Sequence, residues 1–369
     1  MGIFVNYCAG ASRDVLPARH VDSLLYNVPQ NACSEAAVRG TRKLIHESCA
    51  KNVFGDSGGY QLLQKDLEGG VAVTYDPSKP ISYGKFAVNI NPELIIQANM
   101  KIKPQIMTSL DFPVPKISDP YLQYEEFMKK LGPNLVCMRE TALLRKKYCP
   151  EIELYIPIQC YTLAQFEAYI EKPLMELEFD GLSLPTRNLG SGGVTLFLLK
   201  FYQMGIRKIH LLSVSSFTGL ALAAYLARHI FDWCSTDATT WRFQAERQVY
   251  MDPNDFHGIS VNSNAVFKEG ERPVCDCPWC ASGITFTGIT NIPLTDRSSF
   301  LRCHNFYVVQ KACTEFYENS VDLVTLERCL RKRSVRKKKK IDKLIQALSI
   351  ATHMRDMDIN VLEKMLWKI

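Results

Sequence analysis

Short apolar stretches rich in β-branched residues alternate with longer amphipathic stretches in the first two thirds of the chain, and this alternation constrains the fold more than any other feature. The expected strands are residues 52–54, 105–110, 154–158, 181–184, 208–214 and 230–231, and the expected helices include residues 120–130, 163–170 and 220–228. Strands that alternate with helices build a parallel sheet. The sequence has no Gly-x-Gly-x-x-Gly turn opening a helix after the first strand, which disfavours a dinucleotide-binding fold.

Polar residues occur at or just beyond the ends of successive strands: Asp56, Asp111, Gln159, Ser183, Ser213 and Asp237. In a (β/α)8 barrel the carboxyl ends of the strands converge on one face, where side chains from several loops meet. A single Asp after a strand is an ordinary helix cap or turn residue, but a series at successive strands favours a barrel. We therefore expect an α/β protein with a TIM (β/α)8 barrel over residues 1–252.

Composition excludes several other classes of protein. The 369 residues are 47% apolar and 22% charged, which is typical of a globular chain and not of a disordered or collagen-like one. No apolar run approaches the roughly 18 residues of a membrane span, and no export signal precedes the first polar residues. Thirteen scattered cysteines, an odd number, favour a reducing compartment. We expect a cytoplasmic protein with no membrane partner.

Three cysteines within six residues, Cys275, Cys277 and Cys280, precede His304 and give the strongest metal signal. Zinc prefers four such ligands in a tetrahedron, and a closed set without an open position is typical of structural zinc. Cys303 is an alternative fourth ligand, and four buried cysteines without a metal are the other alternative, which three cysteines within six residues disfavour. We expect a structural Zn2+ in a zinc-binding subdomain over residues 253–320, with a helix at residues 302–318.

A basic run separates the last two expected helices, at residues 321–332 and 341–366. The chain has a net charge of +6, and eight Lys or Arg lie between Arg331 and Lys340 without any acid, which leaves the rest at −2. Such a run is commonly a solvated linker, but Lys and Arg also bind phosphates. We expect the basic helical segment 321–369 to contact nucleic acid through Arg331, Lys332, Arg333, Arg336, Lys337, Lys338, Lys339 and Lys340.

Two further motifs carry carboxylates. The run Phe54-Gly-Asp-Ser-Gly-Gly-Tyr-Gln61 combines a carboxylate, a hydroxyl and glycines that let a flat ligand approach the backbone. The run Phe231-Asp-Trp-Cys-Ser-Thr-Asp-Ala-Thr-Thr-Trp241 places Asp232 and Asp237 near a strand end, where one carboxylate can attack a sugar carbon while another moves protons. Alone, each run is also explained by a turn or by helix capping.

Taken in order and spacing, these motifs resemble the queuine/archaeosine tRNA-guanine transglycosylase family over roughly residues 50–310. The run from Asp56 is similar to that family's Asp-Ser-Gly-Gly-Phe-Gln motif, Ile158-Gln159-Cys160 is similar to its Val-Gln-Gly element, and the cysteine cluster with His304-Asn305 looks like its zinc signature. The resemblance implies a TIM barrel with a zinc-binding subdomain. It also implies a pentosyltransferase that exchanges guanine for a 7-deazaguanine.

The resemblance also implies a role for each matching residue. Asp56 is the expected general acid and base, and Asp237 is the expected nucleophile, because residues 237–241 are similar to the Asp-Ser-Ala-x-Tyr of archaeal members. Asp232 is the alternative nucleophile, because Phe231-Asp232 resembles the Phe-Asp of the same motif. The expected base pocket comprises Ser57, Gly58, Gly59, Asp111, Gln159 and Ser183.

Departures from the family concern the nucleic acid. Bacterial members follow the nucleophile with Pro-Thr-Arg-x-x-Arg, which grips the anticodon loop, whereas this chain has Ala-Thr-Thr-Trp-Arg after Asp237. The sequence also ends before the extra RNA-binding domains of archaeal members. The pattern is similar to the DpdA-type deazapurine DNA transglycosylases of phages and some bacteria.

The expected function is therefore DNA-guanine transglycosylation on double-stranded DNA with a flipped guanine, with a small 7-deazaguanine such as 7-cyano-7-deazaguanine as the incoming base. The alternatives are a tRNA-guanine transglycosylase and a non-catalytic, zinc-containing partner subunit that binds nucleic acid. The resemblance also implies that a phage-encoded member acts in the host cytoplasm. The sequence leaves open whether the chain forms a homodimer.

Overall fold

Eight parallel strands form a closed barrel in the computed structural model, which describes residues 1–10, 21–59, 81–83, 86–88, 90–170, 174, 176–187 and 189–369. The expected α/β class and the barrel are confirmed. Around the barrel the strands follow the order β1 (Ile3–Ala9), β10 (Trp233–Ala238), β9 (Lys208–Leu212), β8 (Gly181–Pro185), β7 (Glu153–Pro157), β6 (Ile106–Thr108), β3 (Asn52–Asp56) and β2 (Ser23–Asn27).

Helices follow most of these strands, and two short hairpins complete the described elements. The hairpins are β4 (Ile81–Tyr83) with β5 (Phe86–Val88), and β11 (Val249–Met251) with β12 (Gly258–Ser260). None of the helices described combines the length and apolar character needed to cross a membrane. The helices are α1 (Val28–Asn31), α2 (Glu35–Ser48), α4 (Pro92–Ile102), α5 (Pro120–Tyr148), α6 (Leu163–Tyr169), α7 (Ser191–Gln203), α8 (Phe217–His229), α9 (Thr240–Glu246), α10 (Phe286–Asn291), α11 (Leu294–Asn319), α12 (Leu323–Arg333), α13 (Lys338–His353) and α14 (Ile359–Leu366).

The chain divides into two compact units. One comprises Met1–Asp22, Gly190–Gly205 and Ser213–Ile369, and the other comprises Ser23–Leu189 and Ile206–Leu212. We call them the terminal unit and the central unit. The boundaries expected at residues 252 and 320 stay a prediction.

Aromatic rings from three strands fill the interior of the central unit. The ring of Phe54 on β3 stacks on His210 of β9 at a centroid distance of 4.4 Å and meets Tyr155 of β7 edge-on at 6.0 Å. Because side chains alternate along a strand, Asp56 points to the same side as Phe54, one layer nearer the carboxyl end. The barrel therefore has an aromatic layer beneath Asp56.

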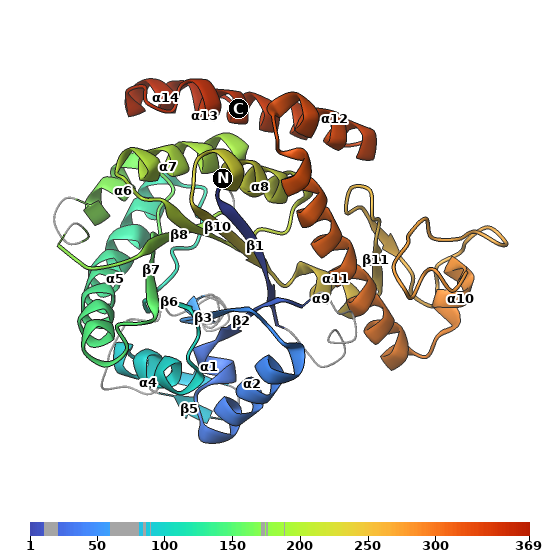
Figure 1. Cartoon of the computed structure of the whole chain (residues 1–369), viewed down its shortest axis with the longest axis horizontal. Coiled ribbons are helices and arrows are strands. Elements are labelled where there is room, and N and C mark those ends of the chain that lie inside the picture. The colour runs from blue at the N-terminus through green and yellow to red at the C-terminus, as the bar shows by residue number, and fades with distance from the viewer. Residues whose placement is uncertain are drawn as a thin grey trace. The chain divides into compact units, whose positions relative to one another are not determined.

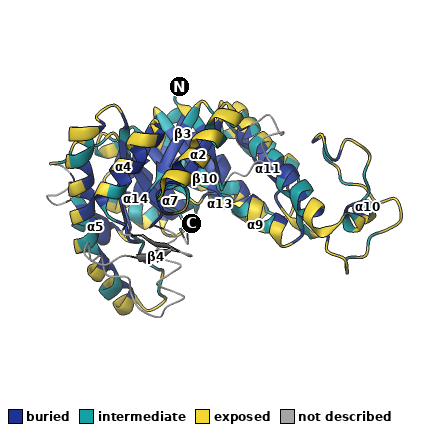
Figure 2. Cartoon of the chain, turned by 90° about the horizontal axis from the view of Figure 1, so that it is seen from below, coloured by how far each residue is buried: buried dark blue, intermediate teal, exposed yellow. Residues whose placement is uncertain are grey.

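In the terminal unit, the first strand of the chain pairs with the last strand of the barrel. The register joins Ile3 to Trp233 and Cys8 to Ala238. The Ala- and Leu-rich helix α8 packs on both strands, and its N-terminus is capped by Ser216, whose hydroxyl accepts a hydrogen bond from the amide of Gly219 at 3.1 Å. Four of the six residues of β10 are buried, and Figure 2 colours the described residues by burial.

The three C-terminal helices cover part of the same unit. Helices α13 and α14 pack on α7, and α13 also packs on α8 (Figure 1). The buried residues Ile341, Leu344, Leu348 and Ala351 recur every three or four positions along α13, which is the period of one helix face. This apolar stripe therefore faces the protein interior and is not available to a partner.

Two expected elements are wrong. Residues 230–231 are not a strand, because Ile230 ends α8 through its amide hydrogen bond to the Leu226 carbonyl at 2.9 Å, and β10 begins at Trp233. The single helix expected over residues 341–366 is two helices, since α13 ends at His353 and Asp358 caps a new helix by accepting from the Asn360 amide at 2.9 Å.

Candidate functional site

The turn after β3 is tied to the end of β6 in the central unit. The Ser57 amide donates to Thr108 Oγ1 at 2.9 Å, and the Ser57 hydroxyl donates to Asp111 Oδ1 at 2.7 Å. The Gly58 amide donates to Asp56 Oδ2 at 3.2 Å, with Gly58 at a φ of 87°, a region that favours glycine. These contacts hold Asp56 and Ser57 in one defined turn. Tyr60 and Gln61 of the same motif lie outside the described residues.

Asp111 is the centre of this group. It is 5% exposed, and its second oxygen, Oδ2, accepts a hydrogen bond from Gln159 Nε2 at 2.5 Å. Burial raises the pKa of Asp111 to about 6, although the hydrogen bonds from Ser57 and Gln159 act in the opposite direction. The carboxyl group therefore changes charge close to neutral pH, as groups in binding and catalytic sites commonly do.

Gly59 packs directly against this carboxylate. A Cβ atom at residue 59 would lie 2.6 Å from Asp111 Oδ1 and 2.9 Å from its Cγ, which is too close for any side chain. The glycine thus leaves the backbone in contact with a buried acceptor. The structure brings together four predicted pocket residues, Ser57, Gly59, Asp111 and Gln159.

Ser183, another predicted pocket residue, is fully buried on β8. Its carbonyl oxygen accepts from the Ile158 amide at 2.9 Å, one residue before Gln159, and its register partner on β9 is His210. Register partners in a parallel sheet point to the same side, so the Ser183 hydroxyl points toward the aromatic layer. This hydroxyl has no hydrogen-bond partner among the described residues. A buried, unsatisfied hydroxyl costs about 1–3 kcal/mol, which a ligand or water would offset.

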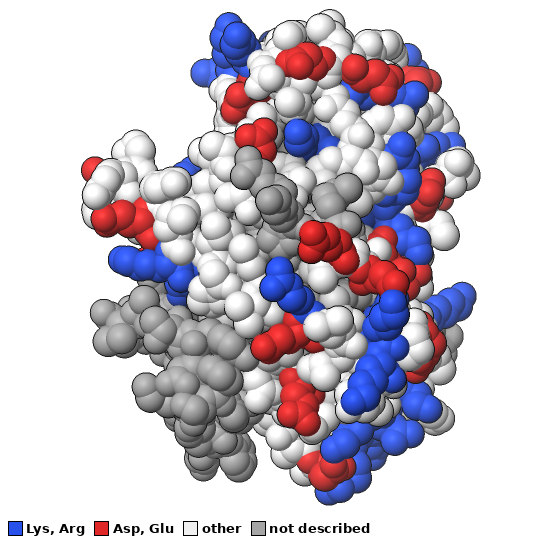
Figure 3. Space-filling model, turned by 90° about the vertical axis from the view of Figure 1, so that its left-hand side faces the viewer, with Lys and Arg blue, Asp and Glu red and all other residues white. Residues whose placement is uncertain are grey.

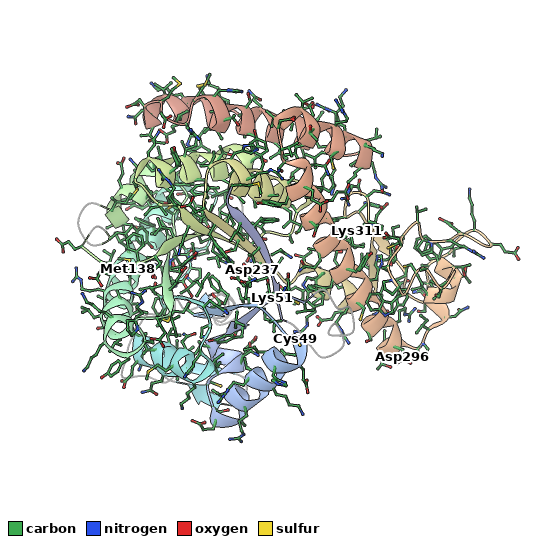
Figure 4. The ribbon with its side chains drawn as sticks, in the orientation of Figure 1. Cys49, Lys51, Met138, Asp237, Asp296 and Lys311 are labelled. Carbon is green, nitrogen blue, oxygen red and sulfur yellow. The ribbon has the colours of Figure 1, made fainter. Side chains whose placement is uncertain are left out.

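Asp237 lies near the carboxyl end of β10 in the terminal unit (Figure 4). Its Oδ1 accepts a hydrogen bond from the Ser213 amide at 2.9 Å. Ser213 has a φ of 62°, a left-handed conformation that non-glycine residues adopt at a cost. The strained turn after β9 thus presents its amide to the carboxylate. Ser213 is a contact that sequence motifs alone did not identify.

Asp232 lies at the other end of the same strand. It is exposed, it precedes β10, and its carbonyl oxygen accepts from the Ile3 amide at 2.8 Å. Five residues of extended chain separate it from Asp237, which corresponds to about 16 Å. The two candidate nucleophiles are therefore at opposite ends of β10, and only Asp237 is near the carboxyl end, where barrel enzymes carry their sites.

A second candidate site holds four potential metal ligands in the terminal unit. The three thiol sulfurs lie 3.7, 3.3 and 3.5 Å from His304 Nδ1 for Cys275, Cys277 and Cys280 respectively. All four ligand atoms lie within 4.8 Å of one another, and all but Cys275 belong to buried residues. The four side chains can bind a metal ion. Cys303 does not belong to this group.

Neighbouring residues fix the orientation of the ligands. His304 Nε2 donates to the Met251 carbonyl at 2.9 Å, which leaves the Nδ1 lone pair directed at the sulfurs. The ring of Tyr250 stacks on the imidazole at 3.9 Å. Asn305, which follows His304, donates to the carbonyls of Trp241 and Val249 and so joins α9 and β11 to α11. These contacts were not predicted, since they depend on elements far apart in the sequence.

The three thiols cannot all ionise without a cation. Hydrogen bonding with Cys277 and Cys280 lowers the pKa of Cys275, and hydrogen bonding with Cys275 raises the pKa of Cys277 to about 11. Hydrogen bonding with the same thiols raises the pKa of Cys280 as well. One thiolate is therefore favoured at the expense of the other two. A divalent cation would stabilise all three as thiolates.

The basic segment begins in the last turn of α12 and ends in the first turn of α13. Four of its eight predicted phosphate contacts have partners within the protein, namely Arg331, Arg333, Arg336 and Lys337. The other four, Lys332, Lys338, Lys339 and Lys340, are exposed. The segment is thus not uniformly available to a ligand.

Comparison with models of protein families finds none that matches this chain, and comparison with curated proteins finds no match either.

Proposed function

We propose that the chain is a base-exchanging transglycosylase that replaces guanine in DNA with a 7-deazaguanine such as 7-cyano-7-deazaguanine. The observation that carries the proposal is the buried Asp111 carboxyl, held by Ser57 and Gln159 against a glycine that admits no side chain. In this proposal the barrel is a TIM barrel, and the metal cluster belongs to a zinc-binding subdomain.

The chemistry of the Asp111 group fits the edge of a guanine-like base. Guanine carries two parallel donors, N1–H and the exocyclic amine, which match the two oxygens of a carboxylate. Gly59 lets the Asp111 carboxylate lie directly against the backbone of the turn, since no Cβ occupies that space. In the ligand-free protein, Ser57 and Gln159 satisfy the same oxygens, so base binding exchanges these hydrogen bonds rather than creating unsatisfied groups.

The reaction proceeds by two displacements at C1′ of a nucleotide that has left the base stack. Asp237 attacks C1′, the bond from C1′ to guanine N9 breaks, and guanine leaves with its electron pair and a proton from Asp56. The incoming 7-deazaguanine then gives its N9 proton to Asp56 and attacks C1′, which breaks the ester bond to Asp237. Two inversions give net retention, as in retaining glycosidases.

The metal in this proposal is zinc with a structural role. Three thiolates and one imidazole complete a tetrahedral set, and the buried cluster offers no open position for a substrate. When bound, zinc would hold residues 275–280 on α11. Lys311 of α11 adds an ion pair with Asp276, which lies between Cys275 and Cys277 in the sequence.

The choice of DNA over tRNA rests on the segment after Asp237. Trp241 is 2% exposed and donates to the Ala238 carbonyl at 2.9 Å, so it belongs to the core. Arg242 pairs with Glu246 at 2.8 Å on α9. This segment therefore offers no cluster of free arginines comparable to an anticodon grip, which favours a different nucleic acid.

Incorporation of labelled guanine tests the proposal. The protein is incubated with radiolabelled guanine and either duplex DNA or tRNA, and acid-precipitable label is counted. Label in DNA and not in tRNA is the expected result. Label in tRNA alone would mean that tRNA, the alternative, is the substrate. Label in neither nucleic acid would reject base exchange. A covalent protein–DNA species on a denaturing gel, expected only with Asp237 present, distinguishes an enzyme from a non-catalytic partner subunit.

A further inference from the structure

The cations of the α12–α13 corner fall into two sets that the sequence does not distinguish. Nine Lys or Arg residues and one acid, Asp342, lie between Arg331 and Lys343. We call Arg331, Arg333, Arg336 and Lys337 the clamp residues, because each contacts an acidic or carbonyl group of the same unit. We call Lys332, Lys338, Lys339, Lys340 and Lys343 the outward lysines.

The clamp residues anchor the corner to the loop after β11. Arg333 donates to the Asn254 carbonyl at 3.1 Å and pairs with Glu315 of α11 at 2.7 Å. Arg336 pairs with Asp252 at 3.1 Å and with the buried Asp255 at 3.2 Å.

Lys337 and Arg331 complete this anchoring. Lys337 donates to the Asp255 carbonyl, and burial lowers its pKa. Arg331 forms ion pairs with Glu327 at 2.7 Å and with Asp342 at 2.6 Å. The acidic side chains next to the corner are thus already paired with the clamp residues.

The outward lysines keep their charges free. They are exposed, and they make no hydrogen bond or ion pair with any residue between 189 and 369 or elsewhere in the described chain. Lys339 and Lys343 are four residues apart on α13 and so lie on the same helix face, where like charges repel. The face drawn in Figure 3 instead has Lys and Arg interspersed with Asp and Glu over much of its surface. A concentrated positive surface on a chain that is otherwise slightly acidic attracts anionic partners, whose charge offsets the repulsion among the lysines.

We propose that the outward lysines form a docking surface for the phosphodiester backbone of DNA, held in place by the clamp residues and separate from the base pocket. The identity of the polyanion as DNA rests on the proposed function. An anionic membrane is disfavoured, because membrane-binding helices insert an apolar face, and the apolar face of α13 is buried on α7 and α8. Contacts to phosphates supply affinity without sequence information, which suits an enzyme that must scan a duplex.

Salt-dependent binding of a short labelled duplex by fluorescence anisotropy tests the docking surface. The variant K338Q/K339Q/K340Q should bind more weakly at low salt, and the slope of log K against log salt should flatten by about 0.9 for each lost contact, or about three units in total. The matched control K51Q/K103Q/K147Q removes the same charge from exposed lysines just before β3, β6 and β7, the ends of the strands that do not carry barrel active sites. Its slope should equal that of the wild type.

The outcomes separate this inference from the proposed function. A triple variant with the wild-type slope overturns the docking surface, whatever the exchange activity. A flattened slope supports it even if no labelled guanine is incorporated, in which case the proposed function alone fails. If the lysines control binding to tRNA or to phosphatidylserine vesicles and not to the duplex, DNA is the wrong partner. At saturating DNA the exchange rate of the variant should match that of the wild type.

Discussion

Gly59 and the carboxylate of Asp111 are in such close contact that a Cβ atom at residue 59 would stand 2.6 Å from Oδ1. The contact joins the motif after β3 to a residue that follows β6, more than fifty positions later in the chain. It also explains why the turn after Asp56 contains a glycine at this position.

Replacement of Gly59 by alanine should therefore damage the base pocket. Asp111 or the turn must move, at a cost of about 1–3 kcal/mol in the free energy of unfolding, and guanine exchange should fall by at least about tenfold. Gly40→Ala is the matched control, since nothing lies within 4 Å of a Cβ built there on α2. That control should be as stable as the wild type or more so. A Gly59→Ala variant with unchanged kcat/KM would separate Asp111 from base binding.

The pKa of Asp111, raised to about 6 by burial, predicts how stability depends on pH. The folded protein binds this proton more tightly than the unfolded chain, whose Asp residues titrate near about 3.9. Stability from this group is fully present below about pH 4 and is lost as pH rises through about 6. Urea unfolding of the wild type and of Asp111→Asn across this interval should show the fall in the wild type only. Parallel curves for the two proteins would contradict the assignment.

The same titration predicts the pH profile of activity. In the proposed function, base binding needs the ionised carboxylate of Asp111, so log kcat/KM should rise with pH and level off above a pKa of about 6. The profile is measured with labelled guanine over the acid range. A profile that stays flat between pH 5 and 7 would mean that Asp111 does not need to be ionised for binding.

Asp237→Asn should lower exchange by several orders of magnitude, because a covalent nucleophile is lost. Binding of duplex DNA should stay near the wild-type value. Asp232→Asn is the control, since Asp232 is exposed at the amino end of β10. An inactive Asp232→Asn beside an active Asp237→Asn would interchange the two assignments, and two active variants would reject the mechanism.

About one zinc per chain should co-purify, as measured by atomic emission. Cys277→Ser should remove the metal and unfold the region around β11 and α11, since structural zinc supplies folding free energy. Cys303→Ala should keep the zinc, because Cys303 does not join the ligand group although it is adjacent to His304. Loss of zinc from Cys303→Ala and not from a His304 variant would reverse the choice of fourth ligand.

The strands that the sequence predicted well are apolar and continuous, such as Leu154–Ile156. The strand β10 was placed too early because Ile230 and Phe231 are more apolar than the Cys, Ser, Thr and Asp that follow. Its position depends instead on pairing with β1 and on the buried hydrogen bond between Thr236 and Asn6, at 2.9 Å. Hydropathy contains no information about such a partner 230 residues away.

The candidate site likewise combines residues that the sequence singled out with contacts that it did not predict. The motifs led to side chains that lie together in the structure, namely Cys275, Cys277, Cys280 and His304 in one group and Ser57, Asp111 and Gln159 in another. The sequence placed Ser213 at a strand end but did not predict that its amide contacts Asp237, because that contact depends on a left-handed backbone at φ 62°. It did not identify Thr108, whose hydroxyl accepts from the Ser57 amide. The sequence also did not predict that the basic run divides into clamp residues and outward lysines, because this depends on where Asp252 and Asp255 lie after folding.

The pairing of β1 with β10 also delays one step of folding during synthesis of the chain in the cell. One of the two barrel neighbours of β1 is β10 at residues 233–238, so this edge of β1 must wait while more than two hundred further residues are made. At about 5–20 residues per second, this delay is roughly ten to fifty seconds. Throughout that time the edge of β1, with its buried Val5, Tyr7 and Cys8, is exposed to wrong partners. We expect this interval to limit the yield of folded protein. Slower synthesis or added chaperone should therefore change the yield more than a change in the stability of the finished barrel does.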